Sequence, residues 1–191
     1  MKLLIAYGSK GKLFHMSEFV NSLEKFGVQC KLVKDTDYSK GFPSKNPKDW
    51  LFGNKKFKKL IEDIKPDAVF IDRQSHFGSD VLKAKIPLFV LLRGHYWSEI
   101  DFAKKTLYKG LLMRMVIWFR NRIAEKIFRE STAVFPICKY LEKVVKQHHP
   151  SQTTAVFFEG INSTHWHHTK GTKLNHPCVG LLQDANWWGK T

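Results

Sequence analysis

Short polar segments follow several apolar runs of this sequence, and one of them combines a cation with an imidazole. In Arg93-Gly94-His95 the guanidinium can pair with a phosphate, and a neutral imidazole can donate or accept one hydrogen bond. We therefore interpret His95 as a candidate catalytic residue and Arg93 as a candidate phosphate-binding residue. A histidine that only packs at the end of a strand is the alternative interpretation.

A second polar segment, Gly8-Ser9-Lys10-Gly11, joins the first apolar run to a predicted helix. Backbone N–H groups and the helix dipole at such a junction can hold a phosphate. The segment is not a GxGxxG motif, so a simple tight turn is the alternative. Its candidate phosphate-binding residues are Ser9, Lys10 and Gly11. A third segment, 73–77, contributes Arg73 and His76 as candidates for lining an acceptor pocket.

Alternating strands and helices are predicted to position these segments. Continuous apolar runs are typical of strands buried on both faces, and apolar residues spaced three and four apart are typical of amphipathic helices. The alternation predicts an α/β fold with a Rossmann-like, doubly wound parallel sheet and right-handed crossovers. The predicted strands are 2–7, 28–33, 67–72, 86–92, 133–136 and 155–158, and the predicted helices are 13–26, 55–65, 79–85, two within 97–130, and one that Pro150 ends.

The carboxyl ends of parallel strands meet at one edge of a sheet, so the polar segments are expected to lie together there. The connection 35–54 contains Gly, Pro, Ser and Asn throughout and predicts a long loop. The residues predicted to face the core are Phe14, Phe19, Val20, Leu23 and Phe26 in the first helix and Tyr140, Leu141, Val144 and Val145 in the last.

The stretch 132–166 has a recognisable order: an apolar strand, a helix starting Lys-Tyr-Leu, a Val-Phe-Phe strand, then Gly-Ile-Asn and an aromatic residue. In this order it resembles the end of the N-terminal domain of family 4 glycosyltransferases, which have the two-domain GT-B fold. The family usually has Ser before the helix and Pro-Asn-Gly-Val-Asp after the strand. Here Cys138, Phe158-Glu159 and Asn162 stand at the differing positions, while Ala124-Glu125 and 179–182 extend the resemblance.

The resemblance implies that residues 1–170 are the N-terminal, acceptor-side half of a GT-B fold. Residues 171–191 would then be a linker and the start of a missing C-terminal donor-binding domain. The complete enzyme would transfer a sugar from a nucleotide-sugar donor to a glycan or lipid-linked acceptor without a metal, and this fragment would be inactive alone and bind no cofactor. In that arrangement His95 lies near the acceptor or the transferred sugar, and Glu159, Gly160 and Asn162 line the interdomain cleft.

The composition favours an anionic partner. The formal net charge of the 191 residues is +15, while 43% hydrophobic and 14% aromatic residues exclude a disordered chain. A basic α/β nucleic-acid-binding module is therefore the alternative function. Against it, the basic residues do not interleave with aromatic residues on one predicted sheet face. Three scattered cysteines and the short apolar N-terminal run indicate a cytoplasmic protein.

The segment 97–130 is longer than one crossover helix requires. Residues 111–119 are apolar almost all round, and basic residues surround them between 104 and 129. One interpretation is a core helix with a solvated basic end. The other is a peripheral contact with an anionic membrane at its inner face.

Two further motifs predict no function. Gly189-Lys190-Thr191 resembles the end of a phosphate-binding loop, but Asp184 occupies the position of the first glycine of that motif. Histidines near residues 148 and 165 have neither helical His-x3-His spacing nor cysteine partners, so we expect no metal site.

Overall fold

The computed structural model describes residues 1–42, 44, 48–49 and 53–160, without the side chain of Lys10. Residues Met1–Phe158 form one compact unit, and a second unit begins at Glu159. Only Glu159 and Gly160 of the second unit are described, so the predicted boundary at residue 170 lies outside the described residues.

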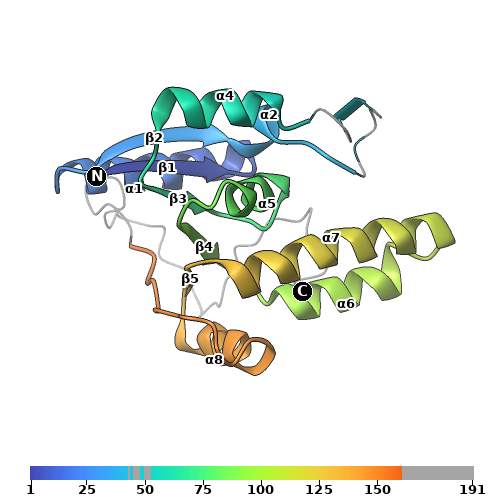
Figure 1. Ribbon diagram of the computed structural model, residues 1–191. Helices are drawn as coiled ribbons and strands as arrows, with labels where there is room; N and C mark the ends of the chain where they lie inside the picture. Colours follow the sequence, from blue (N-terminus) through green and yellow to red (C-terminus); the bar gives the residue numbers. More distant parts are fainter. Residues whose placement is uncertain (43, 45–47, 50–52, 161–191) are drawn as a thin grey trace, which may run out of the picture. The chain divides into compact units, whose positions relative to one another are not determined.

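Five parallel strands form the centre of the first unit (Figure 1). Their order is β2-β1-β3-β4-β5, with β1 paired to both β2 and β3. The direction of strand addition reverses at β1, which places a topological switch point between β1 and β3. This confirms the predicted Rossmann-like parallel sheet. The strands are β1 (Lys2–Tyr7), β2 (Gln29–Lys34), β3 (Ala68–Ile71), β4 (Leu88–Leu92) and β5 (Ala133–Pro136).

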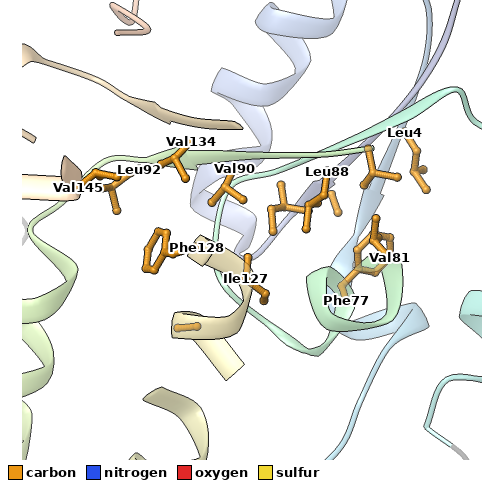
Figure 2. Close-up of a cluster of buried hydrophobic side chains, with 14 of the residues drawn as sticks. Leu4, Phe77, Val81, Leu88, Val90, Leu92, Ile127, Phe128, Val134 and Val145 are labelled. Carbon is orange, nitrogen blue, oxygen red and sulfur yellow. The ribbon is translucent and has the colours of Figure 1, made fainter. Parts of the chain in front are cut away.

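Helices cover both faces of the sheet. Alternate residues of each strand point to opposite faces, so the strands contribute side chains to two separate hydrophobic clusters, one on each face of the sheet. One cluster packs against α1, and the larger one packs against α4, α5, α7 and α8, with Phe77, Ile127 and Phe128 fully buried (Figure 2). The helices are η1 (Lys10–Lys12), α1 (Leu13–Glu24), α2 (Asp35–Tyr38), α4 (Lys55–Ile64), α5 (His76–Lys83), α6 (Tyr96–Thr106), α7 (Leu111–Glu130) and α8 (Lys139–His148).

Three predicted core residues are exposed instead. Phe14 is 50% and Phe26 85% exposed, while Met16 is buried. Met16, Phe19, Val20 and Leu23 follow the helical spacing of one face, so Phe14 lies off that face and Phe26 lies beyond the helix end. Tyr140 is 62% exposed because Leu141, Val144 and Val145 alone fill the inner face of α8.

The boundaries of two other predicted elements differ from the structure. The predicted loop 35–54 begins with the short helix α2, whose Asp35 is buried. Helix α5 begins at His76, three residues before the predicted start. The region 97–130 forms two helices, as predicted, joined by a connection that ends at Gly110.

The predicted sixth strand at 155–158 is wrong as a regular, buried strand. The chain runs beside β5 and makes three backbone hydrogen bonds to it, of which Phe157 N to Pro136 O is the last. A parallel ladder also needs a donor at residue 136, and proline has no N–H. Pairing is therefore reduced to an isolated bridge between Val134 and Thr154, and Phe158 is 70% exposed.

Candidate functional site

Five residues meet where the carboxyl ends of β1, β2 and β3 lie side by side. We call Gly8, Lys12, Asp35, Asp72 and Arg73 the switch-point cluster. Parallel sheets bind ligands at this edge, because the strand order reverses there and leaves room between the loops. The cluster contains two carboxylates and two cations, so its chemistry depends on how these charges are paired.

Arg73 and Asp35 form a forked ion pair. Arg73 Nε lies 2.6 Å from Asp35 Oδ2, and a terminal guanidinium nitrogen lies 2.8 Å from Oδ1. Asp35 is buried, whereas the Arg73 side chain is 41% exposed. Arg73 crosses directly over Gly8, where a Cβ atom would lie 2.5 Å from its Nε. Gly8 is therefore required by the path of Arg73, and this arginine supports the edge of the sheet.

Asp72 is a buried carboxylate whose oxygens accept no well-formed hydrogen bond from the described residues. Its nearest cation is Lys12, with Nζ 3.3 Å from Oδ2. Burial raises the pKa of Asp72, and the charges of Lys12 and Arg93 oppose that rise only in part. Ser75 Oγ, three residues further on, is also buried without a partner among the described residues. Buried polar groups without well-formed hydrogen bonds cost stability, which is typical of a site kept for function.

The loop after β1 presents its backbone to solvent. Ser9 and Gly11 are exposed, and the Ser9 carbonyl accepts a hydrogen bond from Lys12 N in the turn η1. Helix α1 follows without a side-chain cap. Lys12 belongs to this loop, and it brings a cation to the start of the helix beside Asp72.

His76 packs beneath the connection that follows β2. Its Nε2 lies 2.8 Å from the carbonyl oxygen of Phe42, and a Cβ at Gly41 would collide with its ring. His76 therefore holds residues 41–42 over the N-terminus of α5.

His95 is the N-cap residue of α6. Its Nδ1 accepts a hydrogen bond from Ser98 N at 3.1 Å. This hydrogen bond requires Nδ1 to be unprotonated, so it assigns the ring proton of a neutral His95 to Nε2. The half-buried ring lies 6.0 Å from that of Tyr140 at the start of α8. Beside it, Arg93 is half-buried and acts electrostatically on Asp72.

A further polar group joins α6, α7 and α8 beside His95, whose ring centroid lies 6.5 Å from that of Trp97. Glu125 accepts a hydrogen bond from Trp97 Nε1 at 2.9 Å, and its other oxygen lies 2.9 Å from His149 Nε2. Trp97 also stacks on His148, with ring centroids 4.1 Å apart. Glu125, which the family resemblance singled out, thus ties three helices together.

The remaining predicted site residues belong to the second unit or lie outside the described residues. Glu159 and Gly160 are exposed and belong to the second unit, and Asn162, residues 165–176 and 189–191 lie outside the described residues. In the part of the chain that the structure describes, no group of three His, Cys, Asp or Glu side chains could hold a metal ion. Nor is any helix there long and apolar enough to cross a bilayer.

Lys12, Asp35 and Asp72 were not among the site residues predicted from the sequence. Each carries a signal that could have found it: Asp35 and Asp72 directly follow apolar strands, and Lys12 is one residue beyond the glycine pair. An acidic residue at the end of a buried parallel strand lies at the ligand-binding edge by topology alone.

No known family model and no curated protein matches the sequence. Among solved structures, the fold is similar to a UDP-N-acetylglucosamine 2-epimerase from Rickettsia bellii, with a TM-score of 0.52 at 15% identity. The match covers 81% of this chain and 43% of the epimerase, so the chain spans less than half of that protein. The likeness shows the fold: a Rossmann-like α/β unit of the kind found in one half of GT-B-like enzymes.

Proposed function

We propose that this chain is the acceptor-side half of a GT-B glycosyltransferase similar to family 4, with its first domain ending near residue 170. The complete enzyme would transfer a sugar from a nucleotide-sugar donor to a glycan or lipid-linked acceptor. A C-terminal domain would supply most donor contacts, and this half would bind no cofactor or metal of its own. It would act in the cytoplasm.

The observation that carries this proposal is the buried polar edge at the β1–β3 switch point. Asp72 stays buried with no well-formed hydrogen bond from the described residues, although burying an apolar residue there would cost less, and Lys12 and Arg93 place positive charge around it. The similar fold of a nucleotide-sugar epimerase is consistent with sugar chemistry at such an edge. Arg73 and His76 would shape the acceptor side indirectly, by holding the loops around Gly8 and Phe42.

In this proposal Arg93 pairs with a phosphate of the donor or acceptor, and the loop of Ser9, Lys10 and Gly11 offers N–H groups to the same anion. His95 acts as a neutral hydrogen-bond donor through Nε2, because its Nδ1 is used to cap α6. A positioned donor is worth most when charge develops on the reacting sugar, so its loss would lower turnover more than binding.

The experiment uses the full-length gene product with a panel of nucleotide sugars and both glycan and lipid acceptors, and it follows nucleotide release. His95→Ser keeps a capping oxygen but is too short to replace the imidazole, so it should lower turnover about 100-fold without changing the melting temperature. Lys58→Ala, on the exposed face of α4, is the control. Full turnover in His95→Ser would refute the role of His95, and no turnover with any donor would refute the function.

The nucleic-acid alternative gains no comparable support. Stacking on single strands needs aromatic side chains beside basic ones on an open platform. Both faces of this sheet pack against helices, and the exposed Trp118 and Phe119 lie on α7 instead.

A further inference from the structure

The tip of the α6–α7 hairpin exposes more large apolar side chains than any other part of the described chain. Leu111 is 89% exposed and Leu112 is 66% exposed, in the first turn of α7. A contiguous apolar surface of this kind marks an interaction site. The hairpin tip consists of residues 102–119, and its exposed large apolar residues are Phe102, Leu107, Leu111, Leu112, Met113, Met115, Trp118 and Phe119.

Helix α7 has two different halves. Ala124, Ile127 and Phe128 are buried in the core, so the C-terminal half is anchored to the sheet. At 3.6 residues per turn, the opposite face carries Leu111, Met115 and Trp118 in its first half and Arg122, Lys126 and Arg129 in its second. A membrane contact of this helix would therefore be narrower than the predicted range 104–129, because the second half offers only a basic face.

Basic residues border the apolar tip. Lys105, Lys109 and Arg114 are exposed there, and the Arg122 guanidinium lies 5.4 Å from the centre of the Trp118 ring. Asp101, the acidic residue closest to the tip along the sequence, is paired with Lys104 at 3.2 Å. An apolar end with a cationic border matches a bilayer whose headgroups are anionic. A second copy of this chain would bring the same positive charges face to face, which disfavours self-association through the tip.

We propose that the α6–α7 hairpin tip is a membrane-docking element that inserts into the interface of an anionic lipid bilayer. The apolar part of α7, from Leu111 to Trp118, is about 10 Å long, and the apolar face of an interfacial helix is buried to a depth of about 5–10 Å. The long side chains of Lys105, Lys109, Arg114 and Arg122 would then reach the lipid phosphates while their neighbours are inserted. The docking does not depend on the sugar-transfer proposal.

Docking would also orient the candidate site. Figure 1 shows α6 and α7 extending past the carboxyl ends of the strands, on the side where α2 lies. Phe42, which follows β2, contacts Phe119 with ring centroids 4.9 Å apart. The tip and the switch-point cluster thus belong to one side of the unit. If the proposed function holds, its acceptor would be presented from the membrane surface.

The test measures binding of the 191-residue chain to sedimentable vesicles, either pure phosphatidylcholine or with about one third phosphatidylserine. We expect stronger binding to the anionic vesicles and weaker binding as salt rises from about 0.05 to about 0.5 M. Arg114→Glu/Arg122→Glu should lower the partition coefficient by at least about 20-fold, since each basic residue near the surface contributes roughly fivefold. Leu111→Ser/Leu112→Ser should also lower the partition coefficient, although the charge of the protein is unchanged, because less apolar surface enters the bilayer.

The matched control is Lys56→Glu/Lys58→Glu, which makes the same charge change on the exposed face of α4. This control variant should bind the anionic vesicles nearly as strongly as the unmodified chain does. Equal losses in the control and the tip variants would show unspecific adsorption of a basic protein and overturn the proposal. Binding of Leu111→Ser/Leu112→Ser at the level of the unmodified chain, or no binding to either vesicle, would also overturn it. Because the substituted leucines and arginines are exposed, circular dichroism should show that all variants are folded.

Discussion

Replacing Asp72 by Asn should stabilise the protein at neutral pH. The ionised carboxylate is buried and accepts no well-formed hydrogen bond from the described residues, which costs about 1–2 kcal/mol more than a neutral amide in the same place. The ion pair with Lys12 stabilises the folded protein by less than about 1 kcal/mol, because the lysine side chain is 35% exposed and its charge is partly screened. The net gain in the free energy of unfolding is then about 1 kcal/mol at pH 7.

The gain should depend on pH in a defined direction. Burial raises the pKa of Asp72, so the folded protein binds this proton more tightly than the unfolded chain does. The wild-type protein therefore recovers stability as pH falls through the raised pKa towards the ordinary value of 3.8, and Asp72→Asn cannot. The difference between the two proteins should shrink from pH 7 downwards.

Urea unfolding of both proteins between about pH 4 and pH 8 measures this difference. Asp63→Asn, at an exposed position of α4, is the control and should leave the free energy of unfolding unchanged. If Asp72→Asn instead lowers the free energy of unfolding by more than about 1 kcal/mol at pH 7, the ion pair with Lys12 stabilises the fold and our reasoning is wrong. A difference that stays constant with pH would refute the role of the buried charge.

Three further substitutions test the contacts around the edge. Gly8→Ala should cost about 2–3 kcal/mol in urea unfolding, because its Cβ would displace Arg73 from its buried carboxylate partner. Glu125→Ala should cost about 2 kcal/mol and shift the fluorescence of Trp97, since both carboxylate oxygens are used. His95→Ala should lower the free energy of unfolding by about 1 kcal/mol, and His95→Ser should restore most of it.

For each of these substitutions, one outcome would contradict the prediction. Wild-type stability in Gly8→Ala would mean that Arg73 can leave its position without cost. An unchanged melt of Glu125→Ala would show that packing alone holds α8. Equal stability of the alanine and serine variants at His95 would show that the imidazole does not cap α6.

Except for β2, the strands could be predicted because they are apolar on both faces. Runs such as Leu3–Ala6 and 88–92 have no other plausible place than the centre of a parallel sheet, and the alternation with helices determined the class. The prediction of a strand at 155–158 was wrong because a pattern of apolar residues does not show which residues will be its hydrogen-bonding partners. Pro136, which prevents regular pairing, belongs to the neighbouring strand.

The candidate site was predictable only in outline. Topology placed the loops after β1, β3 and β4 at one edge, but the pairing of charges within that edge is a matter of three-dimensional contact. Nothing in the spacing of Arg73 and Asp35 indicates a forked ion pair across two strands. Likewise, the N-cap role of His95 depends on where α6 begins, and helix starts are among the least certain features of a sequence.

The missing N–H of Pro136 also affects how the protein behaves at high concentration. The edge of a sheet is a template on which another chain can add a strand, and this is a common route to aggregation. Beyond β5 the chain's own residues 153–157 already occupy the edge. A strand from another molecule that replaced them would also lack one backbone N–H donor, because Pro136 has none. At the opposite edge, β2 places the exposed Lys31 in its centre, and a charge there repels the same residue of a second copy. Both edges of this sheet are thus poor templates for fibrous growth.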